Sequence, residues 1–217
     1  MKQHYITVMG TIGSGKSTAA KLLARELGLT LLEENFGENA FLPRFYDDMK
    51  RWAFHSQTFF LMEKITQMLK TKELLAALPK KTAKGKLSGI IQDTPLLQDV
   101  FSYAKAQNIL GNMDDSEWRL YQKIYRSFAP HLPQPNLILY LKTGINTVTT
   151  RIVKRQRDFE KQVPEGYLEL LEMLNERWLK RESNGARLIT IETDGLNFAH
   201  NQTDMHTFVD MVYKELI

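Results

Sequence analysis

Residues 10–17 read Gly10-Thr11-Ile12-Gly13-Ser14-Gly15-Lys16-Ser17, which matches the phosphate-binding pattern G-x-x-x-x-G-K-[ST] at every fixed position. The stretch follows an apolar run at 5–9 and opens a helical pattern at 16–27, as the motif requires. Glycines let the loop wrap closely and turn backbone N–H groups inward, and the helix N-terminus favours anions. We therefore expect the segment from Gly10 to Thr18 to bind a nucleotide, with Lys16 on the β- and γ-phosphates and Ser17 on Mg²⁺.

Short apolar runs alternate with helical patterns along the whole chain. The runs that predict strands are 5–9, 29–32, 87–92, 137–141 and 187–191. The patterns that predict helices are 16–27, two within 41–78, 96–110, 115–129, 147–157, 164–181 and 203–216. This alternation predicts an α/β fold of the P-loop NTPase type: a three-layer α/β/α arrangement with a five-stranded parallel sheet and a helical lid. No linker or repeat divides the sequence, so we expect one domain, residues 1–217, with the lid at about 151–163.

The composition narrows the class of protein. The 217 residues include no cysteine, which excludes disulfides, thiolate metal sites and a cysteine nucleophile, and favours a cytoplasmic location. The sequence has no apolar run long enough to cross a bilayer. A formal charge of +4 suits an anionic small-molecule substrate, and without a clustered basic patch it does not indicate a nucleic acid polymer or a membrane as partner.

P-loop proteins divide into kinases, GTPases and ATP-driven machines. The chain is short for a motor domain, and it contains no N-K-x-D sequence for reading guanine. By elimination, the sequence indicates a kinase that uses ATP and Mg²⁺ to phosphorylate a small molecule.

Beyond the P-loop, several stretches occur in the order typical of one enzyme family. They are Glu33 to Asn39, Phe45 to Phe54, Gln57 to Leu61, Gln92-Asp93, Gln98 to Val100, Gly111 to Met113, and Arg155-Gln156-Arg157-Asp158-Phe159-Glu160, which fits R-x-R-x-x-E. Together they resemble the deoxynucleoside kinase family, in particular its bacterial deoxyadenosine/deoxyguanosine kinase branch. The resemblance implies ATP-dependent phosphorylation of the 5′-hydroxyl of a deoxynucleoside. It also implies a homodimer formed through the helices between strands three and four.

The resemblance assigns roles to four residues around the nucleoside. A kinase needs a carboxylate that accepts the hydroxyl proton, and Glu34 follows the second predicted strand, at the sheet edge where α/β proteins bind ligands. Tyr46 and Glu160 match the pair that binds the sugar 3′-hydroxyl, and Gln57 matches the amide that reads the base. An amide suits that role because it donates and accepts hydrogen bonds at once. Taken singly, each could also be an ordinary core or surface residue.

Lys64 and Asp99 match a cation–carboxylate pair that lies near the base in family members that accept purines or deoxycytidine. The family has arginine where this chain has Lys64, so bidentate geometry is lost. The pair favours a base with an exocyclic amino group. The alternative is a surface lysine and an unrelated helix acid.

The predicted lid carries three arginines. Arg155 and Arg157 lie two residues apart, and Arg151 lies one turn earlier. Arginine stabilises negative charge that spreads over phosphate oxygens, so the resemblance implies a catalytic role for Arg155 and Arg157 and nucleotide contact for Arg151. The alternative is a basic helix end favoured by the helix dipole.

The end of strand three departs from the family pattern. The family has Asp/Glu-Arg-Ser, whereas this chain has Asp93-Thr94-Pro95. Asp93 is retained and is expected near Mg²⁺, but the arginine beside the catalytic carboxylate is missing. Either another cation replaces it, such as Arg51 or a lysine of the segment 80–86, or the protein is slow, differently specific or no longer a kinase. Two alternatives follow: a thymidylate-type nucleoside monophosphate kinase, and a nucleotide-binding protein that has lost catalysis and acts through a partner.

Overall fold

The computed structural model describes residues 3–34, 36–79, 86–155, 163–182 and 186–216. Five parallel strands form one sheet in the order β2-β3-β1-β4-β5. The strands are β1 (His4–Met9), β2 (Thr30–Leu32), β3 (Gly89–Asp93), β4 (Leu137–Lys142) and β5 (Arg187–Glu192). Ile6 of the central strand pairs with Ile91 on one side and Leu137 on the other. The five-stranded parallel sheet predicted from the apolar runs is confirmed.

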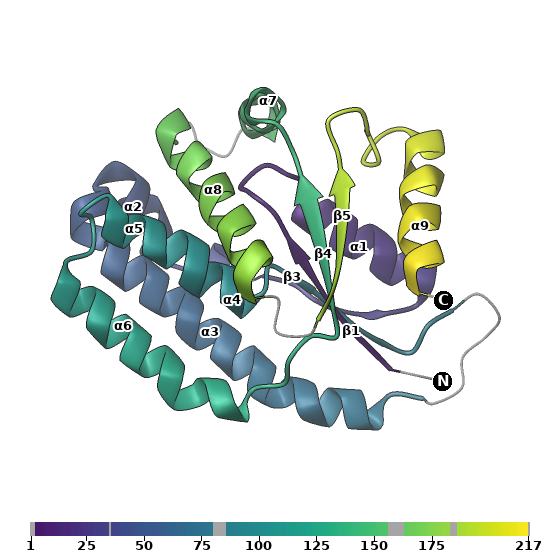
Figure 1. Cartoon of the computed structure of the whole chain (residues 1–217), viewed down its shortest axis with the longest axis horizontal. Helices are drawn as coiled ribbons and strands as arrows, with labels where there is room; N and C mark the ends of the chain where they lie inside the picture. Colours follow the sequence, from purple (N-terminus) through teal and green to yellow (C-terminus); the bar gives the residue numbers. More distant parts are fainter. Residues whose placement is uncertain (1–2, 35, 80–85, 156–162, 183–185, 217) are drawn as a thin grey trace.

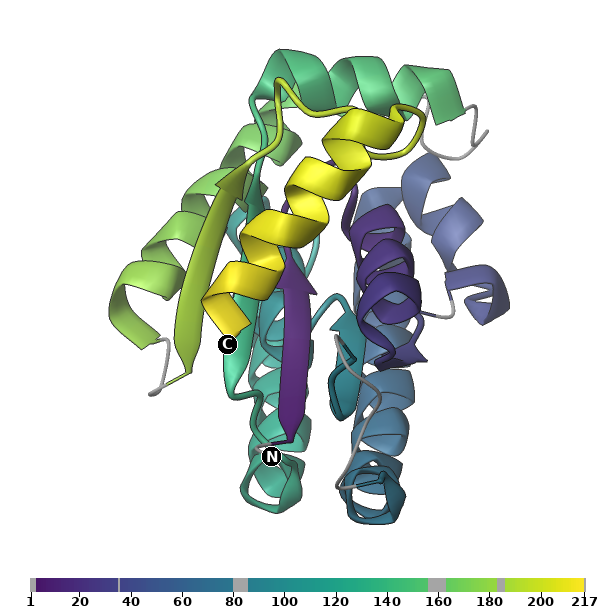
Figure 2. The same ribbon diagram turned by 90° about the vertical axis from the view of Figure 1, so that its right-hand side faces the viewer.

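Helices cover both faces of the sheet (Figures 1 and 2). They are α1 (Lys16–Leu27), α2 (Leu42–Asp47), α3 (Met49–Ala77), α4 (Leu96–Gln98), α5 (Lys105–Ile109), α6 (Asp115–Phe128), α7 (Ile145–Arg155), α8 (Glu165–Glu182) and α9 (Gln202–Leu216), with short 3₁₀ turns at Phe36–Glu38 and Ala129–His131. One face carries α1 and α9, and the other carries α3, α4 and α8. Helix α7 lies across the carboxyl edge of the sheet (Figure 2). This edge holds the candidate site.

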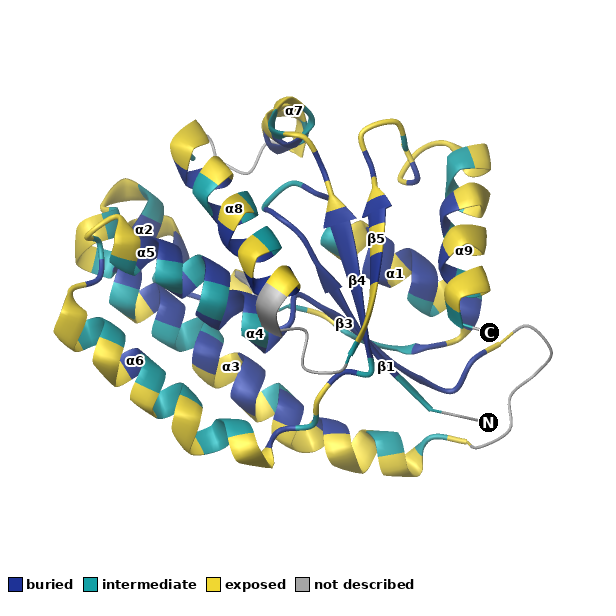
Figure 3. Cartoon of the chain, viewed as in Figure 1, coloured by how far each residue is buried: buried dark blue, intermediate teal, exposed yellow. Residues whose placement is uncertain are grey.

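The apolar core has two main parts. One lies between the sheet and helices α1 and α9, and includes the fully buried Ile6, Leu139 and Phe208. The other joins α2, α3 and α6, where Phe45 and Tyr121 are buried away from the sheet. Figure 3 shows β1, β3 and β4 dark blue along most of their length. Burial of one large apolar side chain contributes roughly 1.5–3 kcal/mol, so the strands that carry the site are firmly held.

The two helices predicted within 41–78 are confirmed as α2 and α3. They divide at Asp48, whose side chain accepts a hydrogen bond from the backbone N–H of Arg51 and so caps α3. The predicted helix 96–110 contains a π-helical segment, η2 (Asp99–Ala104), between α4 and α5. A π-helical turn is often found at functional sites because it redirects side chains. Among the described residues, no helix is long and apolar enough to cross a membrane.

Candidate active site

The P-loop lies between β1 and α1 and is held from two directions. The buried amide of Gln98 pairs with the peptide of Gly10, since Gly10 N donates to Gln98 Oε1 at 3.3 Å and Gln98 Nε2 donates to Gly10 O at 2.7 Å. The Thr11 hydroxyl donates to a carboxylate oxygen of Glu172 on α8. A Cβ at position 10 would lie 2.8 Å from the Leu141 carbonyl oxygen, so only glycine fits there. The loop is therefore shaped before a nucleotide arrives.

Lys16 is bound to neutral oxygens of the loop and of η2. Its Nζ donates to Gly10 O at 2.9 Å, to Thr11 O at 3.1 Å and to the Tyr103 hydroxyl at 3.2 Å. Burial lowers the pKa of Lys16, while Asp93 and Glu34 oppose that shift. Phosphate oxygens are stronger, charged acceptors than these groups. The ammonium therefore has partners that a nucleotide can replace.

Ser17 and Asp93, the predicted metal pair, lie side by side. Asp93 ends β3, is 5% exposed, and is hydrogen-bonded to the side chain of Ser17. Burial and the charge of Glu34 raise the pKa of Asp93, whereas Lys16 and the Ser17 hydrogen bond lower it. Within the described residues, no three carboxylates or histidines gather to hold a metal ion. A hydroxyl and a carboxylate suit Mg²⁺, which takes its remaining ligands from phosphates and water.

Glu34 and Asp99 lie on either side of Lys64. The Lys64 Nζ is 2.7 Å from Glu34 Oε1 and 3.3 Å from Asp99 Oδ2. The side chains of Lys64 and Asp99 are each 4% exposed and that of Glu34 is 23% exposed. Although burial opposes it, the two carboxylates raise the pKa of Lys64 above its ordinary value, so it remains charged. Burial raises the pKa of Asp99 to about 7 against the pull of Lys64.

Tyr46, Gln57 and Tyr103 complete the nucleoside side of the site. Tyr46 lies on α2 with its ring edge against Phe45, at a centroid distance of 5.0 Å. Gln57 is buried on α3, and its amide makes no hydrogen bond with any residue that the structure describes. Burial raises the pKa of Tyr103, and the charges that add to this effect come from Glu34, Tyr167, Asp99 and Tyr46. Glu34, Asp99 and Tyr46 thus act on Tyr103, which sequence reasoning did not identify.

The predicted lid is only partly described. Arg151 donates to Ser14 O at 3.0 Å and to Thr193 O at 2.8 Å, so it joins the back of the P-loop to the end of β5. Arg155 is the exposed last residue of α7, and its charge lowers the pKa of Lys16. Arg157 and Glu160 lie outside the described residues.

A groove of about 950 Å³ runs from the P-loop under α7. Besides P-loop residues and Arg151, it is lined by polar and aromatic side chains that no motif identified, including Asn146, Thr150, Lys154, Asn197, Phe198 and His200. Several of them belong to the loop that follows β5. The rule that α/β proteins bind ligands beyond the carboxyl ends of their strands is the signal that could have found this loop.

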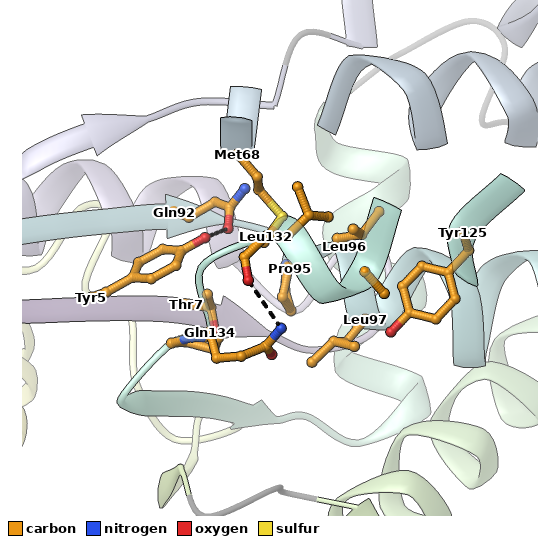
Figure 4. A pocket seen from close by; sticks show the side chains of 12 residues that line it. Tyr5, Thr7, Met68, Gln92, Pro95, Leu96, Leu97, Tyr125, Leu132 and Gln134 are labelled. Atoms are coloured by element: carbon orange, nitrogen blue, oxygen red, sulfur yellow. Dashed lines mark hydrogen bonds between the residues drawn. The ribbon is translucent and has the colours of Figure 1, made fainter. Parts of the chain in front are cut away.

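A second, much smaller cavity lies apart from the P-loop (Figure 4). Its volume is about 10 Å³, which is room for about one water molecule at most. In Figure 4 the hydroxyl of Tyr5 points to Gln92, to which it donates a hydrogen bond of 2.7 Å. The rest of its lining is mostly apolar, with Met68, Leu96 and Leu97 among its residues. The groove beside the P-loop is the better candidate for ligand binding.

Comparison with known proteins gives consistent relatives. The sequence model of the family described as "Deoxynucleoside kinase" matches residues 6–217. The chain is 28% identical over 220 residues to the deoxyadenosine/deoxycytidine kinase of Bacillus subtilis (98% of this chain, 95% of the relative). It is 30% identical over 216 residues to the deoxyguanosine kinase of the same organism (98% and 97%). The solved deoxyadenosine kinase of M. mycoides with bound dCTP superposes with a TM-score of 0.75 at 25% identity, covering 97% of both chains.

Proposed function

Since the chain belongs to the deoxynucleoside kinase family, we propose that it transfers the γ-phosphate of ATP to the 5′-hydroxyl of a purine deoxynucleoside or deoxycytidine. The observation that carries this proposal is that Glu34 and the P-loop Lys16 lie in one site and influence each other electrostatically. Phosphoryl transfer to a hydroxyl requires a proton acceptor and a group that holds the γ-phosphate in the same site.

The reaction follows from these positions. Glu34 accepts the proton of the 5′-hydroxyl while that oxygen bonds to the γ-phosphorus, and the bond from the γ-phosphorus to the β–γ bridging oxygen breaks to release ADP. Lys16 exchanges its neutral partners for the β- and γ-phosphates, and Arg155 and Arg157 would stabilise the spreading negative charge. Ser17 and Asp93 would hold Mg²⁺, which neutralises phosphate charge when bound.

The nucleoside would lie between α2, α3 and η2. Tyr46 and Glu160 would bind the 3′-hydroxyl, and the buried amide of Gln57 would read the base edge. With a pKa of about 7, Asp99 can accept a hydrogen bond from an exocyclic amino group or donate one to a ring nitrogen. Adenine, guanine and cytosine carry such groups, and the two Bacillus subtilis relatives are named for the deoxynucleosides of all three.

The nucleotide would occupy the groove beside the P-loop, with α7 forming the start of the lid at about 151–163. We further propose a single-domain protein that forms a homodimer through the helices between β3 and β4, of which α6 exposes Leu120. Helix α3, which precedes β3, packs against α6 and exposes Met62 and Leu69, so we extend the proposed interface to α3. The lack of cysteine supports a cytoplasmic location.

The test is release of ADP from Mg·ATP with each of the four deoxynucleosides and each of their monophosphates. We expect turnover on one or more deoxynucleosides and loss of nearly all of it in Glu34→Gln. Glu33→Gln is the matched control, because Glu33 is the adjacent acid, is 56% exposed and pairs with Lys21 instead. This control should retain the wild-type rate.

Two other results would replace the proposal. Turnover on monophosphates alone would assign a nucleoside monophosphate kinase. Stabilisation by ATP without ADP release on any acceptor would assign a nucleotide-binding role without catalysis, since ligand binding alone raises apparent stability. The specific observation that favours this last role is the uncharged Thr94 at the end of β3, with its hydroxyl 3.3 Å from Asp93 Oδ1.

A further inference from the structure

Glu34 needs a cation to hold its carboxylate in one position, and the end of β3 does not provide one. Thr94 is uncharged and fully buried, and its hydroxyl donates to Asp93 rather than to Glu34. The guanidinium of Arg51 lies over the ring of Trp52 at 5.3 Å. Lys86, at the end of the segment 80–86, donates to backbone carbonyls at the end of α1. Neither of these described residues is bound to Glu34.

Lys64 is the cation that lies beside the Glu34 carboxylate. Its Nζ is 2.7 Å from Glu34 Oε1, and its side chain is 4% exposed. A buried, hydrogen-bonded ammonium is held far more rigidly than a lysine in water, because leaving the pair would strand its charge. Asp99 lies on the other side of Lys64, with its Oδ2 3.3 Å from the Lys64 Nζ. The ammonium is therefore fixed between the two carboxylates.

The backbone beside Glu34 is anchored to the same helix. Gln67, one turn after Lys64 on α3, donates from Nε2 to the carbonyl oxygen of Glu33 at 3.0 Å. Gln92 of β3 donates to Gln67 Oε1 at 2.8 Å, and Tyr5 of β1 donates to Gln92 at 2.7 Å. This row of hydrogen bonds runs from the central strands of the sheet to the loop that carries Glu34.

We propose that Lys64 is a positioning residue that aligns the Glu34 carboxylate for proton transfer and so replaces the arginine missing at position 94. This inference rests on the proposed function, in which Glu34 is the base. It gives Lys64 a role different from the base contact that its sequence position predicts. The ammonium donates a hydrogen bond to Glu34 and forms an ion pair with Asp99.

The two roles of Lys64 separate kinetically. If Lys64 aligns Glu34, Lys64→Met should lower kcat on the order of 10²-fold, as loss of a preorganised charged group does, and by a similar factor for every deoxynucleoside accepted. Lys64→Arg keeps the charge and should retain kcat within about tenfold of wild type. Lys70→Met, an exposed lysine on the same helix, should behave as wild type.

A change in KM and in the preference among bases, with kcat unchanged, would overturn the inference and assign Lys64 to the base. Equal losses in Lys64→Met and Lys64→Arg would also overturn it, because the charge would then not matter.

A second readout does not depend on activity. Thermal unfolding of Lys64→Met, Glu34→Gln and the double variant forms a double-mutant cycle, which measures the coupling of two groups in contact. We expect the Tm loss of the double variant to be clearly smaller than the sum of the single losses, because Glu34→Gln removes the carboxylate that Lys64→Met leaves unpaired. Additive losses would show that the two side chains are not coupled and would reject the inference.

The two readouts also separate the inference from the proposed function. A wild-type protein that turns over no deoxynucleoside rejects the kinase proposal and with it the catalytic purpose of Lys64. A wild-type protein that is active and loses activity in Glu34→Gln, but keeps full activity in Lys64→Met, leaves the kinase proposal standing and rejects the inference alone.

Discussion

Asp99 is buried beside a cation, yet its Oδ2 makes no well-aligned hydrogen bond among the described residues. Buried polar atoms in native proteins are almost always satisfied, so an exception is a place where a ligand group can bind. The side chain also begins the π-helical segment η2, which brings it to Lys64. Both properties agree with the proposed role of Asp99 in reading the base.

The raised pKa of Asp99 has a consequence for stability. Burial raises its pKa from the ordinary value of 3.8 to about 7, so between these values the folded protein holds a proton that the unfolded chain does not. The stabilisation is full below about pH 4 and is lost as the pH rises through about 7. Relative to Asp99→Asn, the wild-type free energy of unfolding should therefore fall between about pH 4 and pH 7, by up to about 1.4 kcal/mol per pH unit, and should level off above that range.

Urea titrations at several pH values measure this difference. The charged groups that face Asp99 are Lys64 from α3, Glu34 from the loop after β2 and Lys16 from α1, and all three stay in place in the variant. The exposed Asp210→Asn is the matched control and should follow the wild-type curve. Parallel curves for wild type and Asp99→Asn would contradict a pKa near 7.

Thr94 shows what a sequence can and cannot tell at the scale of one residue. The sequence identified the missing arginine, but not that Thr94 has a left-handed backbone with φ of 56°. A β-branched residue is a rare exception in that region, and such strain persists mainly at functional sites, where the surroundings enforce it. Thr94 N donates to Val8 O at 3.1 Å, which is part of what holds it. No local pattern encodes this tertiary constraint.

At the scale of elements, the two hydrogen bonds that join Gln98 of α4 to Gly10 of the P-loop can be tested directly. Gln98→Leu removes both hydrogen bonds to Gly10 and leaves the buried Gly10 N–H without a partner, while the Gly10 carbonyl keeps its hydrogen bond from Lys16. The cost should be about 2 kcal/mol or more, which lowers the Tm by about 4–8 °C in a chain of this size. The KM for ATP should rise as well, because the loop is no longer shaped in advance.

Calorimetry and ATP titrations measure these two effects. Gln202→Leu, at the exposed start of α9, serves as control and should change neither value. If Gln98→Leu kept the wild-type Tm and KM, the prediction would be wrong, because the P-loop would then hold its shape without these two hydrogen bonds.

The elements themselves could largely be predicted from the sequence. The apolar runs and the P-loop motif identified all five strands, and the family resemblance is confirmed. The π-helical segment Asp99–Ala104 could not be predicted, because a shift of backbone hydrogen bonds depends on what packs around the helix. The contact between Lys64 and Glu34 was also missed. It joins residues 30 positions apart through a loop whose path has no sequence signature.

At the scale of the whole molecule, the homodimer is the main open prediction. Met62 and Leu69 of α3 are 40% and 46% exposed, and their spacing of seven residues places them on one face of the helix. We expect sedimentation equilibrium to give about twice the chain mass of 25.2 kDa. The double substitution Met62→Glu and Leu69→Glu should shift the mass to that of a monomer, because charges would be buried in the interface.

Met211→Glu is the control for this experiment, because Met211 is 42% exposed on α9, which covers the other face of the sheet. Its mass should equal that of the wild type. A wild-type protein that sediments as a monomer at all concentrations would reject the dimer.

The hydroxyl of Tyr103 lies between the two halves of the site. It accepts a hydrogen bond from Lys16, on the phosphate-donor side, and its pKa is raised by Glu34, Asp99 and Tyr46, on the acceptor side, in addition to burial. When Lys16 binds the phosphates of a nucleotide, the Tyr103 hydroxyl loses its hydrogen-bond donor. It can then form a hydrogen bond with a molecule bound on the acceptor side. Donor and acceptor should therefore bind with synergy, each increasing the affinity for the other, and an enzyme of this kind would be slow to hydrolyse ATP when no acceptor is bound.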